Sequence, residues 1–255
     1  MADKSLSGKV AIVTGGGQGV GRGCALAMAR AGAKIALNGR TASKIEDVKA
    51  EIEAAGSEAI AVPGNIKDKG DIDALVSATM DTFGRIDILV NNAQEVPLGP
   101  LLHVSDDDFE AGFQSGPLAT HRLMNACHPH LKNSGEGMIF NFASSAGIRW
   151  DMANYGAYGA VKQAIRALSR AAASEFGPDN IRVLTIAPHA DSPGLKAWID
   201  HNPDEAAEFF KTIPLRRIGS CEDDIGEALV GLCDPKLSYL TGATIPLDGG
   251  QANFD

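Results

Sequence analysis

The sequence predicts an α/β fold in which helices pack on both faces of a parallel sheet. Short apolar runs of strand length alternate with amphipathic runs of helix length along most of the chain. Glycines close several of the helical runs. No linker rich in proline, glycine or serine, and no break in composition, divides the 255 residues. We therefore expect one domain over 1–255, with a doubly wound sheet of about seven strands.

The first strand, loop and helix form a recognisable unit. Residues 9–14 are apolar and β-branched, which is typical of a buried strand. Glycines dominate 15–21, and a helix is expected over 24–30, closed by Gly32. In such a unit the backbone N–H groups and the helix N-terminus can meet a pyrophosphate. The glycine spacing is GxxxGxG rather than GxGxxG, but its position between strand and helix still favours a Rossmann-like dinucleotide site.

The end of the second strand bears on the choice of cofactor. After the strand at 35–37 come Asn38, Gly39 and Arg40. Proteins that take NAD usually carry an acidic residue here, which binds the ribose hydroxyls. A guanidinium would instead bind a 2′-phosphate. Arg40 therefore favours NADP(H) over NAD(H), with an ordinary surface arginine as the alternative.

The alternation continues to residue 187 and resumes near the end of the chain. We expect helices at 45–55, 72–83, 106–131, 155–176 and 222–232, and strands at 59–62, 86–90, 138–142, 181–187 and, with a turn, 240–250. Gly116 and Pro117 should interrupt or kink the helix at 106–131.

Residues 188–215 break the pattern. This irregular stretch holds Trp198, Phe209 and Phe210. A long segment that leaves the carboxyl edge of a sheet and carries apolar bulk suits a substrate lid. An interaction surface and a simple helical excursion are the alternatives.

The stretch from Ser144 to Lys162 carries the candidate chemistry. Tyr158 and Lys162 lie four residues apart in an alanine-rich run, so one helix would place both on the same face. A neighbouring cation lowers the pKa of a phenol, which can then exchange a proton with a carbonyl or an alcohol. Ser144 and Ser145 follow a predicted strand, and a serine hydroxyl there could hold the reacting oxygen. The alternative is that Tyr158 packs between helices and Lys162 is solvated.

Composition excludes several other classes of protein. Hydrophobic residues make up 44% and charged residues 22%, as in ordinary globular proteins. The net charge of −9 and the absence of a basic patch argue against a nucleic-acid partner. No apolar run reaches the ~20 residues of a membrane span, and the N-terminus lacks the apolar core of a signal peptide. Four scattered cysteines lack metal-type spacing, so we expect reduced thiols, no metal site and a cytoplasmic location.

Together these motifs resemble the short-chain dehydrogenase/reductase family, in its compact form, over essentially the whole chain. The glycine loop resembles the family's TGxxxGxG, and 91–93 resemble the start of its NNAG motif. Ser145 stands thirteen residues before Tyr158, which is the family spacing, and Tyr158 with Lys162 matches YxxxK. Pro188 and the segments 213–219, 239–242 and 247–250 resemble its later signatures.

The resemblance implies roles for individual residues. Ser145, Tyr158 and Lys162 would be catalytic. The expected cofactor-binding residues are Gly15, Gly17, Gln18, Gly19, Val20, Gly21, Arg40, Asn65, Ile66, Asn92, Ala93, Tyr158, Lys162, Pro188 and Ser192. Similar proteins are usually homotetramers or dimers, built on the helices near 105–130 and 155–176.

The chain also departs from the family pattern. Gly116 stands where an asparagine usually holds a water in a proton relay, and Gln94 replaces the glycine of NNAG. Asn65 replaces a common aspartate, and His189 replaces the glycine after Pro188. His189 could contact substrate, replace the relay group or simply pack in its loop. The expected substrate contacts are Gln94, His189, Trp150 and Trp198.

These observations give one leading hypothesis and two rivals. The leading one is an NADP(H)-dependent oxidoreductase that interconverts a ketone or aldehyde and an alcohol, with a small molecule as its substrate. The first rival is a dinucleotide- or ligand-binding protein with weak or no redox activity, which the loss at Gly116 motivates. A cofactor-free lyase is the second, and the intact glycine loop and Lys162 weigh against it.

Overall fold

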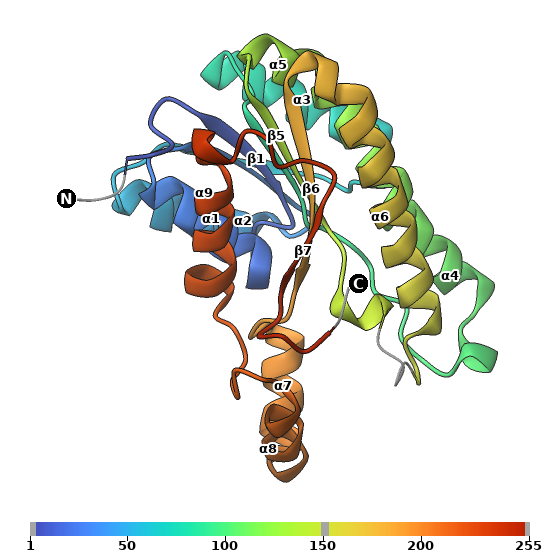
Figure 1. The fold of residues 1–255 in the computed structure, drawn as a ribbon. Coiled ribbons are helices and arrows are strands. Elements are labelled where there is room, and N and C mark those ends of the chain that lie inside the picture. The colour runs from blue at the N-terminus through green and yellow to red at the C-terminus, as the bar shows by residue number, and fades with distance from the viewer. Residues whose placement is uncertain (1–3, 149–152, 253–255) are drawn as a thin grey trace.

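The computed structural model describes residues 4–148 and 153–252, and its seven parallel strands form one sheet (Figure 1). The strand order is β3-β2-β1-β4-β5-β6-β7. The strands are β1 (Val10–Thr14), β2 (Lys34–Gly39), β3 (Ala59–Pro63), β4 (Ile88–Asn91), β5 (Gly137–Phe142), β6 (Ile181–Pro188) and β7 (Thr244–Leu247). The order reverses between β1 and β4, which is where such sheets bind ligands at their carboxyl edge. The predicted doubly wound α/β class is confirmed.

Helices cover both faces of the sheet, as Figure 1 shows. Alternate residues of β1 feed the two cores: Val13 packs in one, and Ile12 in the other. The first core is shared with α1 (Gly19–Arg30), α2 (Ala42–Ala54) and α9 (Glu227–Leu232). The second is shared with α3 (Lys69–Phe83), α5 (Ala119–Ser134) and α6 (Gly156–Phe176).

The helix expected over 106–131 is interrupted, as its Gly-Pro pair predicts. It consists of α4 (Asp106–Phe113), a π-helical turn η2 (Gln114–Leu118) and α5. Pro117 cannot donate a backbone hydrogen bond, and its ring crowds the preceding turn, so the chain widens there. A second π-helical segment, η5 (Cys221–Gly226), leads into α9.

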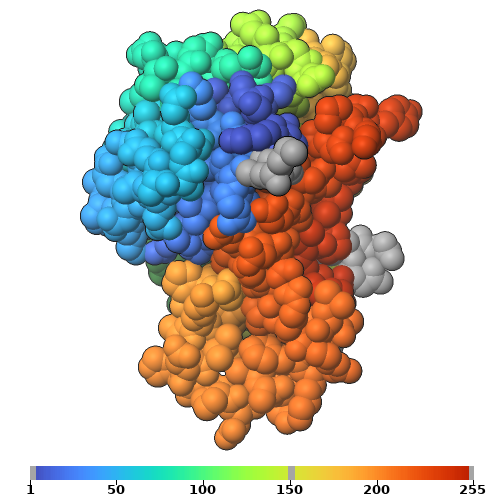
Figure 2. Space-filling view, turned by 90° about the vertical axis from the view of Figure 1, so that its left-hand side faces the viewer, coloured from blue at the N-terminus to red at the C-terminus, as the bar shows by residue number. Residues whose placement is uncertain are grey.

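The irregular segment 188–215 contains two helices that the sequence pattern did not resolve. They are α7 (Pro193–His201) and α8 (Pro203–Thr212), and both begin with proline at the first helical position. Trp198 of α7 packs edge-on against Phe209 of α8, with ring centres 5.8 Å apart. The two helices project beyond the body of the molecule (orange in Figure 2). Almost all their residues are at least partly exposed, which weakens any helical burial pattern in the sequence.

The described part of the chain adds three general findings. None of its helices combines the length and the apolar character that crossing a bilayer requires. Within 4–148 and 153–252, no group of three or more His, Cys, Asp or Glu side chains is placed to hold a metal ion. All four cysteines are free thiols, and burial raises the pKa of Cys127 to about 12.

The contact between α1 and η5 generates a prediction about stability. The two segments pack backbone against backbone: a Cβ added at Gly23 would collide with the carbonyl oxygen of Cys221. We expect Gly23→Ala to lower the free energy of unfolding by about 3 kcal/mol or more, because backbone atoms cannot move aside. Gly231→Ala in α9 is the matched control, since its added methyl meets open space and should be neutral or stabilising by up to ~1 kcal/mol. Urea denaturation of both variants is the measurement, and equal effects would contradict the packing argument.

Candidate active site

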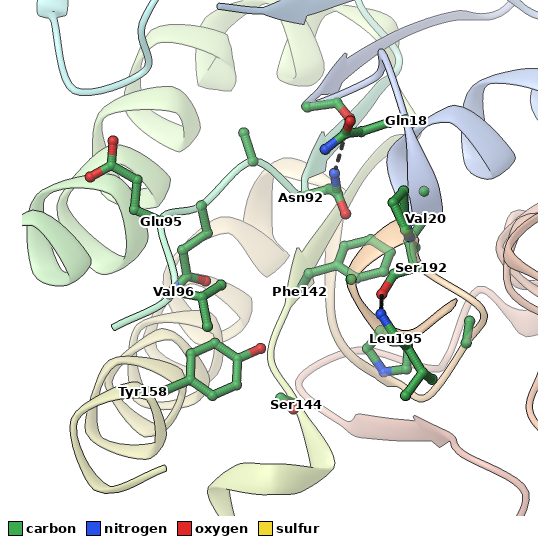
Figure 3. A pocket seen from close by; sticks show the side chains of 18 of the residues that line it. Gln18, Val20, Asn92, Glu95, Val96, Phe142, Ser144, Tyr158, Ser192 and Leu195 are labelled. Carbon is green, nitrogen blue, oxygen red and sulfur yellow. Dashed lines mark hydrogen bonds between the residues drawn. The ribbon is translucent and has the colours of Figure 1, made fainter. Parts of the chain in front are cut away.

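A cavity of about 1130 Å³ lies at the carboxyl edge of the sheet. Figure 3 shows side chains from both halves of the chain around it, with Gln18 and Asn92 on one side and Tyr158 and Ser144 on another. The residues predicted from the sequence that line it are Gly15, Gly17, Gln18, Gly19, Val20, Arg40, Asn65, Ile66, Asn92, Ala93, Gln94, Ser145, Tyr158, Lys162, Pro188, His189, Ser192 and Trp198. Gly21 does not line it, and Trp150 lies outside the described residues.

Thr14, at the end of β1, joins the glycine loop to the loop after β4. Its buried hydroxyl donates to the carbonyl oxygen of Val90 at 3.2 Å and accepts from the backbone N–H groups of Asn92 and Ala93, both at 3.1 Å. The Asn92 amide donates in return to the carbonyl oxygen of Thr14 at 3.0 Å. One hydroxyl thus sets the relative position of the two loops that form the centre of the cavity.

The glycine loop approaches these groups so closely that side chains are excluded. Gly15 has φ of +66°, and a Cβ there would lie 2.7 Å from the amide nitrogen of Asn92. A Cβ at Gly21 would collide with the carbonyl oxygen of Gly15. Gly21 therefore supports the loop from behind, which differs from the expected direct contact with a cofactor.

Tyr158 and Lys162 lie one turn apart on α6, as their spacing predicts. The Lys162 ammonium is buried, donates to the carbonyl oxygen of Phe142 at 2.7 Å and lies 5.5 Å from the centre of the Tyr158 ring. Its anchor is therefore the end of β5. The phenol and the amine share one wall of the cavity.

Burial controls the ionisation of both groups. Desolvation raises the pKa of Tyr158 to about 12, and a hydrogen bond with Ser144 opposes this rise only in part. The sequence led us to expect a lowered tyrosine pKa, but Lys162 points its ammonium at Phe142 and burial dominates. Desolvation also lowers the pKa of Lys162 to about 7. In this structure the tyrosine is a neutral acid beside an amine that titrates near neutrality.

The two neighbouring serines have different partners. Ser145 is buried, and its hydroxyl donates to Oδ2 of Asp248 at 2.8 Å. Ser144 shares a hydrogen bond with Tyr158, and its hydroxyl also accepts from the N–H of Ala146 at 3.2 Å. The resemblance implies a catalytic role for Ser145, whereas in this structure Ser144 is the serine that shares a hydrogen bond with Tyr158. Ser144 has extended backbone and Ser145 begins the short 3₁₀ helix η3 (Ser145–Gly147), so the two neighbouring hydroxyls reach different partners.

A cluster of charged side chains lies where β2, β3 and β4 end, and Arg40, Lys44 and Glu95 of this cluster line the cavity. Arg40, which follows β2, pairs with Glu95 at 2.7 Å, and Lys67 pairs with the other oxygen of Glu95 at 3.1 Å. Lys44 at the start of α2 donates to the Gln18 side chain at 2.5 Å. Sequence reasoning missed Lys44, Lys67 and Glu95. The only available signal was that Glu95 directly follows the altered NNAQ stretch.

The missing asparagine at Gly116 is replaced by packing. A Cβ at Gly116 would lie 2.5 Å from Cγ1 of Val161 and 3.3 Å from Nε2 of Gln94. Val161 is fully buried, and Nε2 of Gln94 is buried with no hydrogen-bond partner among the described residues. Gln94 lines the cavity and Gly116 does not. The two departures at Gln94 and Gly116 therefore occur together: Val161 and the Gln94 amide pack over the glycine.

Beside α7 and α8 the cavity is lined by several aromatic side chains. His189 packs edge-on against Phe209, with ring centres 5.4 Å apart, and Trp198 lies on the other helix of the same pair. Ser192 lines the cavity at the start of α7, where its hydroxyl accepts from the N–H of Leu195 at 3.4 Å (Figure 3). Other lining residues that sequence reasoning missed are Tyr155, Leu195, Glu205 and Gln251.

The buried amine of Lys162 generates a prediction about stability and pH. Its pKa of about 7 lies below the value of 10.5 for an exposed lysine, so between these values the unfolded chain holds a proton that the folded protein lacks. Stability should therefore rise with pH in this window, by up to ~1.4 kcal/mol per pH unit relative to Lys162→Met. Below about pH 6 the difference between wild type and variant should be constant.

Urea unfolding of the cofactor-free proteins at pH 6, 7, 8 and 9 measures this difference. The part of this stability difference that does not vary with pH includes the lost hydrogen bond to Phe142. Only the change of the difference with pH reports the titration of Lys162. A difference that does not change with pH would contradict the lowered pKa.

Comparison with known proteins agrees with this geometry. Residues 15–252 match the family model described as enoyl-(acyl carrier protein) reductase. The chain is 39% identical to the 12α-hydroxysteroid dehydrogenase of a Clostridium species, covering 96% of this chain and 97% of that protein. It is 32% identical to the 3-oxoacyl-[acyl-carrier-protein] reductase of a Synechocystis species, covering 98% and 99% of the two chains.

The fold of this chain is also similar to that of a solved reductase structure. The 3-ketoacyl-(acyl-carrier-protein) reductase of Brucella melitensis, solved with NADH, superposes with a TM-score of 0.88 at 32% identity. The match covers 97% of this chain and all of that one. These relatives are named as dehydrogenases and reductases, and the solved structure contains NADH. The chain therefore belongs to the short-chain dehydrogenase/reductase family of oxidoreductases.

Proposed function

We propose that this protein is an NADP(H)-dependent oxidoreductase that interconverts a ketone or aldehyde and an alcohol. The observation that carries the proposal is a buried Tyr158–Lys162 pair, with Ser144 hydrogen-bonded to the tyrosine, at one end of a cavity whose other end holds Arg40. Acid–base groups and a phosphate-binding cation at opposite ends of one groove suit a dinucleotide laid across the switch point of the sheet.

The lining residues fit such a cofactor. Gly15, Gly17 and Gly19 line the cavity without side chains, and α1 begins at Gly19, so its N-terminus can meet a pyrophosphate. Arg40 and Lys44 lie where β2 ends and α2 begins, and their cations suit a 2′-phosphate. When bound, the nicotinamide would supply or accept the hydride.

Tyr158 would act as the acid that protonates the carbonyl oxygen during reduction. Its raised pKa keeps the proton on the phenol at neutral pH, so it is ready to donate. Lys162, with a pKa near 7, could return a proton to the phenolate and hold a ribose hydroxyl. We assign the serine role to Ser144 in place of Ser145, because Ser144 shares a hydrogen bond with Tyr158 whereas Ser145 is committed to Asp248.

The substrate proposed is a bulky apolar carbonyl compound or alcohol. Trp198 and Phe209 line the cavity beside His189, and the relative at 39% identity is named for a hydroxysteroid. Helices α7 and α8 carry two of these rings, which supports the proposal that 188–215 is a lid. Assembly as a homotetramer or dimer, a cytoplasmic location and a single domain over 1–255 remain predictions from the sequence.

The catalytic assignment predicts distinct effects for three substitutions. Tyr158→Phe should lower turnover by about 10²- to 10⁴-fold and leave NADPH binding intact, because only the acid is lost. Ser144→Ala should lower kcat by roughly 10²-fold. Ser145→Ala should mainly destabilise, by about 1.5–3 kcal/mol, since it removes a hydrogen bond to the buried Asp248. Rates with a carbonyl panel that includes a 12-ketosteroid, together with thermal melts, separate these outcomes.

Two results would change this assignment. Retained turnover in Tyr158→Phe would remove the tyrosine from the mechanism. A larger loss of kcat in Ser145→Ala than in Ser144→Ala would restore the serine expected from spacing.

The cofactor assignment predicts tighter binding of NADPH than of NADH. Arg40→Ala should weaken NADPH by about 10- to 100-fold and leave NADH nearly unchanged, because only the 2′-phosphate loses a charged partner. Fluorescence titration of the reduced cofactors measures both affinities. NADPH binding without oxidation across the carbonyl panel would support the binding-protein rival instead.

A further inference from the structure

The Glu95 carboxylate lies between two cations that come from different parts of the chain. Oε1 is 2.7 Å from Nη1 of Arg40, and Oε2 is 3.1 Å from Nζ of Lys67. Arg40 follows β2 and Lys67 follows β3, whereas Glu95 follows β4 on the other side of β1. The Arg40–Glu95 pair therefore joins the two sides of the switch point.

The backbone holds Glu95 and Lys67 firmly. The Glu95 N–H donates to the Ser115 hydroxyl at 3.0 Å, which attaches this loop to the π-helical turn. The Lys67 carbonyl accepts from Arg122 at 2.7 Å, and the Lys67 N–H donates to Asn65 at 3.1 Å. The Arg40 side chain is 65% exposed and that of Glu95 only 28%. The guanidinium is therefore the member of the pair with open space around it, whereas the Glu95 carboxylate is anchored through its backbone and its second pair with Lys67.

A fixed carboxylate and a 2′-phosphate would compete for the same guanidinium. Arg40 is the residue that we propose binds the phosphate, so this inference rests on the proposed function. In the structure both Arg40 and Lys67 already have an anionic partner. A phosphate placed on Arg40 would also be repelled by the Glu95 carboxylate, whereas an unphosphorylated ribose would carry no such charge.

We propose that Glu95 is a specificity-determining residue that limits the preference for NADP(H) by acting as an internal competitor of the 2′-phosphate. Binding of NADPH transfers Arg40 from Glu95 to the phosphate, and NADH binding leaves the pair in place. Glu95 thereby keeps the affinities for the two cofactors closer together than Arg40 alone would set them.

The test is Glu95→Gln, which preserves shape and the backbone hydrogen bond to Ser115 but removes the charge. We expect NADPH to bind about threefold to tenfold more tightly, as for the loss of one or two partly exposed ion pairs, and NADH to change by less than about twofold. Titration with adenosine 2′,5′-bisphosphate and with AMP isolates the adenosine end from the catalytic residues. The gain should shrink as salt screens the charges.

Two further variants isolate the mechanism. Glu58→Gln removes the same charge from the Lys34–Glu58 pair at the opposite edge of the sheet, and should leave both affinities unchanged. In an Arg40→Ala background, Glu95→Gln should improve NADPH binding less than in wild type, because the contested cation is gone.

The outcomes separate this inference from the proposed function. Weaker NADPH binding in Glu95→Gln would overturn the inference, since Glu95 would then position Arg40 for the phosphate. An equal loss for both cofactors would also overturn it, by making Glu95 a ligand of the ribose hydroxyls. If wild type shows no preference and Arg40→Ala affects both cofactors alike, the NADP(H) proposal itself fails.

Discussion

The buried hydroxyl of Thr14 is the constraint on which the rest of the site depends. It donates one hydrogen bond to β4 and accepts two from the loop after β4, so its hydrogen-bonding capacity is fully used. A side chain of the same shape without the oxygen would leave two partly buried N–H groups without this acceptor. Because β1 and β4 border the switch point, this threonine fixes the width of the groove between them. The close approach of Gly15 to Asn92 follows from that spacing.

Burial, rather than the closeness of the two side chains, determines the pKa values of Tyr158 and Lys162. Lys162 donates a hydrogen bond to the carbonyl oxygen of Phe142 at the end of β5. Its pKa is low because the amine is desolvated by burial. Tyr158 retains its proton for the same reason. The cavity therefore has two kinds of polar group. Tyr158 and Lys162 are buried, whereas the ion pairs of Arg40, Lys67 and Glu95 are partly exposed.

The sequence predicted the sheet and most of the lining residues because those features are local. A β-branched run such as Val10–Thr14 can only be a buried strand here, and YxxxK places two side chains on one helical face. The choice between Ser144 and Ser145 depends on the path of the chain after β5, where Ser144 precedes a short 3₁₀ helix that Ser145 begins, and the spacing to Tyr158 does not reveal this turn. The ion pairs of Glu95 join residues that follow three different strands, Arg40 after β2, Lys67 after β3 and Glu95 after β4. No spacing rule in the sequence links these positions. Gly116 stood out in the sequence as a departure from the family pattern, but its packing against Val161 could not be predicted, since no spacing rule links the two residues.

Asp248 has a consequence for how the protein is made. Its carboxylate accepts hydrogen bonds from Ser145 and from the backbone of Gly250 and Ala252, which ties the turn after β7 to the loop after β5. Ser145 and Asp248 are 103 positions apart, and β7 is the last strand of the sheet. During translation, the segment that carries the serines is synthesised long before its anchor exists. The first core likewise waits for the end of the chain, because α1 packs against η5 and α9. Both sides of the cavity are therefore completed only when the last part of the chain joins the sheet.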